Sequence, residues 1–292
     1  MIFWKNKKVL VTGATGFIGS NLVKKLVDLD ADVTALVRNQ RVSSGNLKYL
    51  IGDISKDNFN FKEFEYVFHL AAIVGVVKCN EDAELAERIN VKGTQFLLES
   101  VKGSENLKKF IYTSTANVYG NQAFPTRETS PTEPIDFYAQ TKLKGERIVL
   151  DYQGKYNLPI TIARISNIYG AGQKLPAAVP NIIKTIQETE EGGEITVGKA
   201  TRDFVSIEDV ITGLLTIAEK GEGIYNLGSG KETSIKTVAQ TIINYLNKPL
   251  IVREKPVKEM KRCFLDTTKI NSLGWFPHWK LEEGLKQILE NE

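Results

Sequence analysis

Three glycines spaced three residues apart stand in the stretch VTGATGFIGS near the start of the chain: Gly13, Gly16 and Gly19. The apolar run VLV leads into them and the helical pattern FIGSNLVKKLVDLD comes after them, so they occupy a turn between a predicted strand and a predicted helix. Such a unit can seat a dinucleotide pyrophosphate on the amino end of the helix. Gly13 would permit the tight turn, Gly16 the approach of a phosphate, and Gly19 close packing of helix on strand. A βα turn without any ligand could carry the same glycines.

The alternation of strands and helices continues as far as Gly170. We expect strands rich in Val, Ile and Leu at 7–13, 31–39, 46–54, 66–73, 108–120 and 158–170, and helices at 17–30, 83–101 and 145–157. This order predicts an α/β fold, a doubly wound Rossmann-like parallel sheet with helices on both faces.

Beyond Gly170 the alternation becomes irregular. A helix is expected after Pro176 and Pro180, followed by a lone strand, GEITVG. The helix EDVITGLLTIAEK and the strand GIYNLGSG should return to the sheet, and the last 60 residues should form a smaller, discontinuous α/β cap. We therefore expect a dinucleotide-binding domain at 1–168 plus 203–230, and a substrate-binding cap at 169–202 plus 231–292.

Composition narrows the classes of partner. The net charge of the chain is only +3 and its basic residues are scattered, which argues against nucleic acid as the main binding partner. Cys79 and Cys263 cannot build a disulfide framework, and His69 and His278 cannot form a histidine-rich metal site, so we expect no metal. No export signal is visible in MIFWKNKKVLV, and no apolar run approaches the roughly 18 residues that a membrane span needs. A cytoplasmic protein without membrane partners is expected.

The glycine pattern T-G-x-x-G-x-x-G, together with YAQTK at 138–142, resembles the extended short-chain dehydrogenase/reductases, particularly the sugar-nucleotide epimerases and dehydratases. The resemblance runs nearly end to end. Its further motifs are GDI at 52–54, HLAA at 69–72, NVKGT at 90–94, STANVYG at 114–120, RISNIYG at 164–170, RDFVSIEDV at 202–210 and FLDTTKINSLGW at 264–275.

Two of these residues suggest acid–base chemistry on their own. Tyr138 and Lys142 stand four apart, so on a helix they share one face. A nearby ammonium should lower the pKa of the phenol, which could then exchange a proton with a sugar hydroxyl while a hydride moves to or from nicotinamide. Thr115, at the family's Ser/Thr position, would steady the same oxygen. The alternative is that Tyr138 packs in the core and Lys142 is a surface charge.

The resemblance also implies a set of cofactor contacts. Asp53 would accept a hydrogen bond from adenine, Asn90 would support the geometry of the active-site helix, and His69 is interpreted as a buried structural histidine. The expected cofactor-binding residues are Gly13, Thr15, Gly16, Phe17, Ile18, Gly19, Arg38, Asp53, Ile54, Leu70, Ala71, Ala72, Tyr138 and Lys142.

The second strand ends in VRNQR, which bears on the choice of cofactor. NAD enzymes usually place Asp or Glu here for the ribose 2′-hydroxyl, whereas NADP enzymes recruit Arg for the 2′-phosphate. Arg38, with Arg41 and Ser43 behind it and no carboxylate nearby, favours NADP over NAD. Stacking of Arg38 on adenine would suit either cofactor.

The residues after Thr115 bear on the reaction. Related 4,6-dehydratases place an acid in these positions, whereas this chain has Ala116 and Asn117, which disfavours dehydration. A C4 epimerase and a 4-ketosugar reductase remain, both acting on a nucleotide sugar at a carbinol. The expected substrate-binding residues are Thr115, Asn117, Tyr138, Asn167, Arg202 and Arg262.

Two further expectations concern partners and alternatives. The family forms homodimers, here expected through helices around Glu84–Lys102 and Tyr138–Tyr152.

A different class of function is an NADP-binding redox sensor or assembly module without turnover, which the presence of Thr115, Tyr138 and Lys142 makes the weaker interpretation. A methyltransferase that uses the glycine turn is weaker still, because it would not need Tyr138 and Lys142.

Overall fold

The computed structural model describes residues 3–257 and 261–291, and its centre is a seven-stranded parallel sheet. The strand order is β11-β6-β5-β4-β1-β2-β3, with every neighbouring pair parallel. The strands are β1 (Lys8–Thr12), β2 (Asp32–Val37), β3 (Leu47–Ile51), β4 (Tyr66–His69), β5 (Lys109–Thr115), β6 (Ile160–Ile165) and β11 (Gly223–Leu227). The order reverses beside β1, so the predicted doubly wound sheet is confirmed.

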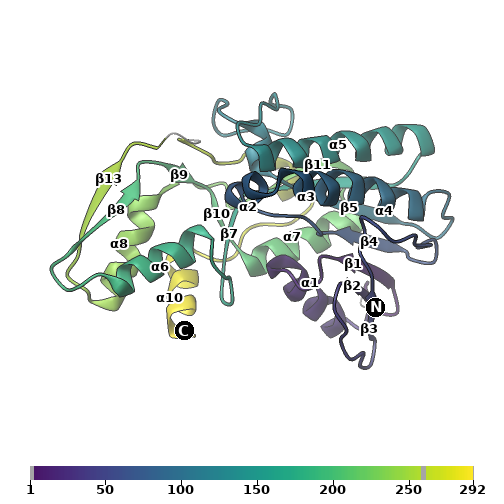
Figure 1. The fold of residues 1–292 in the computed structure, drawn as a ribbon, viewed down its shortest axis with the longest axis horizontal. Coiled ribbons are helices and arrows are strands. Elements are labelled where there is room, and N and C mark those ends of the chain that lie inside the picture. The colour runs from purple at the N-terminus through teal and green to yellow at the C-terminus, as the bar shows by residue number, and fades with distance from the viewer. Residues whose placement is uncertain (1–2, 258–260, 292) are drawn as a thin grey trace.

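Helices cover both faces of this sheet (Figure 1). On one face, α1 (Phe17–Asp28) and α7 (Ile207–Lys220) enclose a hydrophobic core with β1 and β2. On the other face, α4 (Gly93–Val101) and α5 (Phe137–Tyr156) enclose a second core against β4, β5 and β6. Among the described residues, no helix is long and apolar enough to cross a membrane.

The segment expected as one helix at 83–101 is interrupted. It forms α3 (Ala83–Glu87), a π-helical turn at Arg88–Lys92, and then α4. The Thr94 hydroxyl donates to the Asn90 carbonyl at 2.8 Å, and back-bonding of this kind competes with regular helical bonds. A short helix that the sequence did not predict, α2 (Val76–Glu81), precedes this segment.

The strand expected at 158–170 also divides in two. After β6, Ser166 still donates its N–H to Leu227 of β11 at 3.0 Å. The chain then leaves the sheet as β7 (Asn167–Tyr169), which pairs with β10 (Phe204–Ser206) instead. The break therefore marks the point where the chain leaves the main sheet.

A smaller lobe lies beyond one end of the sheet (Figure 1). It contains α6 (Ala178–Glu188), β8 (Glu194–Gly198), α8 (Ile235–Leu246), β13 (Ile251–Lys255) and α10 (Leu281–Glu290), which share a third core. Near it, β9 (Thr201–Arg202) pairs with β12 (Thr233–Ser234), and Ile270 of α9 (Thr268–Asn271) lies in the first core, beneath the main sheet.

The buried carboxylate of Asp203 fixes this junction. It accepts hydrogen bonds from the backbone N–H of Ser229 at 2.7 Å, Gly230 at 3.1 Å and Leu265 at 3.2 Å. Two segments that are distant in the sequence, 229–230 and 265, therefore converge on one side chain. Burial raises the pKa of this carboxyl, and the hydrogen bonds oppose that effect.

Candidate active site

The glycine turn after β1 has the geometry that the sequence predicts. Gly13 has a φ of +67°, and a Cβ there would lie 2.7 Å from the Ala71 nitrogen and the Leu70 carbonyl carbon. A Cβ on Gly19 would lie 2.2 Å from the Gly13 oxygen. The predicted roles of Gly13 in a tight turn and of Gly19 in close packing of α1 are therefore confirmed.

The amino end of α1 has the properties of an anion site. Its N-cap residue is Gly16, so no side chain caps the first backbone N–H groups of the helix, and the first turn carries no acidic residue. Thr15 and Gly16 are exposed, whereas Phe17 and Ile18 pack against the core beneath them. Backbone N–H groups at a helix start without a side-chain cap attract phosphate, so this turn fits a dinucleotide pyrophosphate.

The residues expected near the adenosine half lie along the neighbouring strand ends. Arg38 is exposed after β2, and Asp53 comes after β3. Asp53 Oδ1 accepts hydrogen bonds from the Ser55 N–H and hydroxyl at 2.9 and 2.7 Å. Burial acts to raise the pKa of Asp53, but these bonds, with Lys56 and Arg38 nearby, lower it on balance. Ile54 is buried against Gly93 of α4.

His69 ends β4 and lies in a closed chain of hydrogen bonds. Its Nδ1 lies 2.8 Å from Thr12 Oγ1 and its Nε2 lies 2.8 Å from Thr94 Oγ1. Thr94 donates to the Asn90 carbonyl and Thr12 accepts from the Ala71 N–H at 3.2 Å, so Nε2 carries the proton and Nδ1 accepts. Burial lowers the pKa of His69 to about 3, with Lys142 adding to the effect. The interpretation of His69 as a neutral structural histidine is confirmed.

Asn90 holds the start of α5 against the loop after β4. Its side-chain oxygen accepts from the Ile73 N–H at 2.7 Å, and its Nδ2 donates to the Ile73 carbonyl at 3.0 Å and to Thr141 Oγ1 at 2.9 Å. Thr141 in turn donates to the Tyr138 carbonyl at 2.7 Å. The predicted supporting role of Asn90 is therefore confirmed.

Helix α5 begins at Phe137, before the start that we expected at 145, so Tyr138 and Lys142 lie in its first two turns. The Asp136 side chain caps the helix by accepting from the Ala139 N–H at 2.8 Å. Tyr138 is half-buried and Lys142 is only 3% exposed, so Lys142 is not a surface charge. Thr115 ends β5 and accepts from the Asn117 N–H at 3.3 Å, which leaves its own proton free to be donated.

The electrostatics of the pair differ from the expectation. Burial lowers the pKa of Lys142 to about 7, against the opposing charges of Glu146 and Cys79. Burial also raises the pKa of Tyr138, and Cys79 and Asp136 add to the rise. The expected lowering of the Tyr138 pKa by Lys142 is therefore wrong for this structure. Desolvation dominates at Tyr138, and Lys142, which is itself only partly charged near pH 7, is not among the groups that shift the Tyr138 pKa.

The sequence did not predict a buried ion pair that joins α5 to β6. The carboxylate of Glu146 accepts from Arg164 of β6, Nη2 at 2.6 Å and Nε at 3.0 Å, and both side chains are 5% exposed or less. The Arg164 guanidinium also lies 4.7 Å from the ring centroid of Tyr119. The available signal was the four-residue spacing of Glu146 from Lys142, which places both on one helix face.

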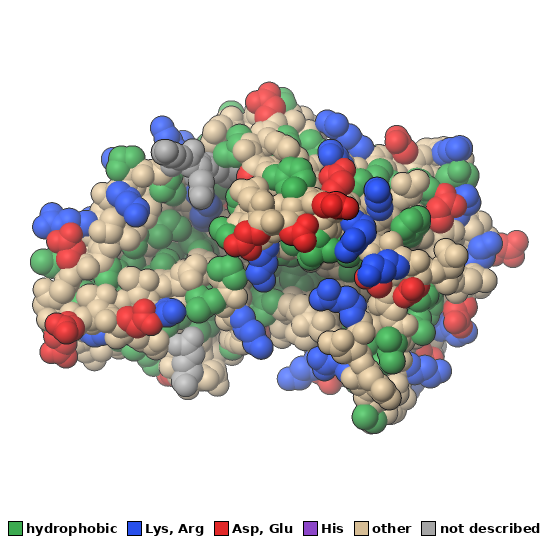
Figure 2. Space-filling view, in the orientation of Figure 1, with side chains coloured by type: hydrophobic (Ala, Val, Ile, Leu, Met, Phe, Trp, Pro, Cys, Tyr) green, Lys and Arg blue, Asp and Glu red, His purple; other side chains and the backbone are tan. Residues whose placement is uncertain are grey.

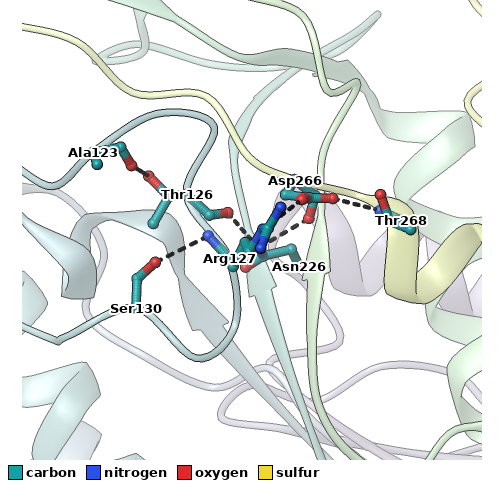
Figure 3. Close-up of polar contacts among 7 residues, drawn as sticks. All are labelled: Ala123, Thr126, Arg127, Ser130, Asn226, Asp266 and Thr268. Carbon is teal, nitrogen blue, oxygen red and sulfur yellow. Dashed lines mark hydrogen bonds and ion pairs between the residues drawn. The ribbon is translucent and has the colours of Figure 1, made fainter.

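A second missed cluster anchors the segment between Thr115 and Tyr138 (Figure 3). Arg127 Nε donates to Asp266 at 3.1 Å, and Asp266 also caps the chain at Thr268 by accepting its N–H at 2.9 Å. Asn226 of β11 donates to the carbonyls of Thr126 at 2.9 Å and Asp266 at 3.1 Å. Segments from three parts of the chain are thereby joined beside the site.

Three of the expected substrate-binding residues lie on segments that run between the two lobes: Asn167, Arg202 and Arg262. Figure 2 shows the surface hollowed between the lobes, with basic side chains beside the hollow. Asn167 lies on β7, and Arg202 on β9 pairs opposite Thr233. Arg262 binds Glu232 through Nε and Nη2, both at 2.7 Å, and lies 4.8 Å from the Phe124 ring centroid. The structure therefore brings Arg202 and Arg262 to one junction, with the fork of Arg262 already engaged by Glu232.

Comparison with known proteins shows the family of the chain. The sequence model described as the NAD dependent epimerase/dehydratase family matches residues 9–228. A putative UDP-glucose 4-epimerase of Methanocaldococcus jannaschii is 33% identical, over 96% of this chain and 97% of that protein. The dTDP-D-glucose 4,6-dehydratase of Homo sapiens is 32% identical, over 97% of this chain and 89% of that protein.

Solved structures agree over the full length. A UDP-glucuronic acid 4-epimerase from Bacillus cereus, in complex with UDP-glucuronic acid and NAD, superimposes with a TM-score of 0.88 at 27% identity, covering 97% of this chain and 98% of that one. A UDP-glucose 4-epimerase from Thermus thermophilus in complex with NAD gives 0.83 at 26% identity, with the same coverage.

Proposed function

Because the chain belongs to the NAD dependent epimerase/dehydratase family, we propose that it moves a hydride between a nicotinamide cofactor and a carbinol of a nucleotide sugar, acting as a C4 epimerase. The observation that carries this proposal is that Thr115 ends β5 and that Tyr138 and Lys142 stand in the first turns of α5, which comes after it in the chain. The end of β5 and the start of α5 lie at the carboxyl end of the sheet. Ligands bind there in open α/β folds, and the glycine turn after β1 lies at the same end.

The protein residues have separate parts in this reaction. Bound nicotinamide would accept the hydride from the sugar and return it. Tyr138 exchanges the hydroxyl proton, and Thr115 donates a hydrogen bond to the same oxygen. Oxidation of the carbinol needs the phenolate of Tyr138 as the base that takes the hydroxyl proton, and the phenol returns that proton when the hydride comes back. Burial, which raises the pKa of Tyr138, favours the second of these steps. Lys142 shares a helix face with Tyr138 and would bond the cofactor ribose.

The cofactor fits the groups that the structure offers. The turn at Gly13–Gly19 and the uncapped start of α1 would hold the pyrophosphate, and Asp53 would face the adenine. Arg38 is exposed at the end of β2 and supports NADP over NAD, although the similar structures from Thermus thermophilus and Bacillus cereus hold NAD. We propose residues 1–168 plus 203–230 as the dinucleotide-binding domain and 169–202 plus 231–292 as the substrate cap.

Epimerisation is preferred to dehydration because of the two residues that come directly after Thr115. Ala116 is buried and Asn117 has no ionisable group, so neither can transfer the protons that elimination of water requires. The similarity to a human dehydratase shows that sequence identity alone does not separate the two reactions. A 4-ketosugar reductase is the second candidate, and it is favoured by Arg38, because reductases commonly exchange NADPH with solution.

The nucleotide sugar would lie in the hollow between the lobes. We assign its contacts to Thr115, Asn117 and Tyr138 around the sugar, and to Asn167, Arg202 and Arg262 around the diphosphate. One guanidinium can bind two phosphate oxygens at once, and Arg262 would exchange its two hydrogen bonds to Glu232 for bonds to the diphosphate. A homodimer through the helices at 84–102 and 138–152 completes the proposal.

Product analysis tests this function. The purified chain is incubated with UDP-glucose and with dTDP-glucose, each with NAD or NADP, and the sugars are identified by proton NMR. Appearance of the C4 epimer without net consumption of cofactor supports the proposal. A 4-keto-6-deoxy sugar would instead show a dehydratase, and NADPH consumption with an added 4-ketosugar would show a reductase. Cofactor binding with no change in any sugar would favour a redox sensor or assembly module.

A further inference from the structure

Tyr112 of β5 touches the same lysine in two ways. Its side chain is fully buried, and its hydroxyl donates to the backbone carbonyl of Lys142 at 3.2 Å. Its ring lies under the side chain of that residue, with the centroid 4.2 Å from Lys142 Nζ. One tyrosine on the sheet therefore contacts both the backbone and the charged end of one residue on α5.

A glycine in α5 makes room for this contact. A Cβ on Gly145 would lie 2.0 Å from the Tyr112 hydroxyl oxygen and 2.7 Å from the ring carbon that bears it. Any other residue at 145 would push the ring away from the helix. Gly154 of the same helix has no such constraint, because among the described residues nothing lies within 4 Å of a Cβ placed there.

The ammonium of Lys142 has little else to hold it. Among the residues that the structure describes, no hydrogen bond or ion pair reaches Lys142 Nζ, and the side chain is 3% exposed. A cation over an aromatic face is stabilised most when both are removed from water. We propose that Tyr112 is a positioning residue for Lys142, holding its ammonium in place and charged, and that Gly145 is present to admit the ring.

The groups around Lys142 leave its protonation state sensitive to the Tyr112 ring. Burial lowers the pKa of Lys142 to about 7, while Glu146 on α5 and Cys79 on α2 oppose this. His69 on β4 is neutral, and Glu146 is itself paired with Arg164 on β6. Tyr138, on the same helix face, keeps its proton because burial raises its pKa. Because the pKa of Lys142 lies near neutral pH, a modest change in the stabilisation of the ammonium decides whether the amine carries a proton at pH 7.

Tyr112 acts through its ring and not as an acid. Burial raises its own pKa well above the usual value, and the nearby Glu146 and Tyr138 add to the rise. It therefore exchanges no proton at ordinary pH, and its effect must pass through Lys142.

The first test measures the ionisation of Lys142 directly, in full-length protein labelled with ¹³C at lysine Cε. Lys142→Met assigns the signal by removing it. Tyr112→Leu should lower the pKa of Lys142 by about one unit, as expected for loss of a desolvated cation–π contact. Tyr112→Phe keeps the ring and should leave the pKa near its starting value. Phe110→Leu is the matched control, since Phe110 is equally buried on the same strand and in the same core.

A second pair of variants guards against misfolding of Tyr112→Leu. Gly145→Ala keeps both Tyr112 and Lys142 but displaces the ring, and should also lower the pKa of Lys142. Gly154→Ala makes the same change on the same helix and should leave it unchanged. Adding Tyr112→Phe to Gly145→Ala removes the closest clash and should recover part of the shift. Equal pKa values for Lys142 in the unmodified chain, Tyr112→Leu and Gly145→Ala would overturn the proposal.

Its consequence for the reaction rests on the proposed function, in which Lys142 binds the cofactor ribose. The pH at which NADPH affinity falls should move down in Tyr112→Leu by the same amount as the NMR pKa. If the NMR pKa moves and cofactor affinity keeps its pH dependence, Tyr112 does position Lys142 and the cofactor role of Lys142 is wrong. The two failures are thus distinguishable.

Discussion

Lys142 is an amine that folding removes almost wholly from water, and its stability cost should depend on pH. Its pKa falls from 10.5 to about 7, so between these values the unfolded chain binds more protons than the folded one. Stability therefore rises with pH through that window, and the cost of the buried charge is greatest below pH 7. Lys142→Met should raise the free energy of unfolding, and by more at pH 6 than at pH 9, in urea titrations.

Lys144→Met is the control for this prediction. Lys144 is an exposed neighbour on α5 that pairs with Glu87 at 2.9 Å, and its loss should change stability by under about 1 kcal/mol at either pH. An equal gain at both pH values for Lys142→Met, or a loss, would show that the amine is not buried as described.

Arg38 tests the choice of cofactor. If its guanidinium binds a 2′-phosphate, Arg38→Ala should weaken NADPH binding by roughly 1.5–3 kcal/mol and leave NADH nearly unchanged. Isothermal titration with both cofactors gives the answer. Equal losses for the two would mean that Arg38 only stacks on adenine.

At the scale of elements, α5 is fastened to the sheet by the Glu146–Arg164 pair. Removing one partner leaves the other charge buried and unpaired, so Glu146→Gln should destabilise the protein by about 3 kcal/mol in chemical denaturation. Glu87→Gln breaks the exposed pair with Lys144 on the same helix and should cost less than about 1 kcal/mol. Similar losses in the two variants would mean that the buried pair does not hold α5.

The elements themselves show what a sequence can and cannot predict. The order of strands and helices was predictable from apolar runs and periodicity, because the strands of the parallel sheet are largely buried on both faces. The π-helical turn at Arg88–Lys92 was not, since Thr94 and Asn90 in and beside it bond to His69 and Ile73, which only the completed fold brings near. The break at Ser166 likewise depends on pairing with β10, some forty residues later.

Exposed apolar side chains lie on the two helices that we expect to pair in a dimer. Phe96 on α4 is 47% exposed and Leu150 on α5 is 39% exposed, and these helices are the ones expected to form a homodimer. Light scattering should give twice the mass of one chain, and Phe96→Glu should give the monomer with an unchanged circular dichroism spectrum. A monomeric unmodified chain would contradict the expected dimer.

The site as a whole was predictable only in part. Thr115, Tyr138, Lys142 and the glycine turn could be proposed as site residues because their chemistry is tied to short spacings in the sequence. Tyr112, Gly145 and Arg164 could not, since each matters only through a contact with a residue far away in the sequence. The charge state of the pair was mispredicted for the same reason: desolvation depends on the completed fold.

The central claim is that Tyr138 moves a proton at a sugar carbinol, and the most direct measurement is turnover of the nucleotide sugar by Tyr138→Phe beside its binding of cofactor and sugar. The change keeps the ring and removes only the transferable proton. Binding of both ligands should stay near its original strength, and turnover should fall by roughly 10²–10⁴, the usual contribution of general acid–base catalysis. Turnover at nearly the original rate would contradict the account.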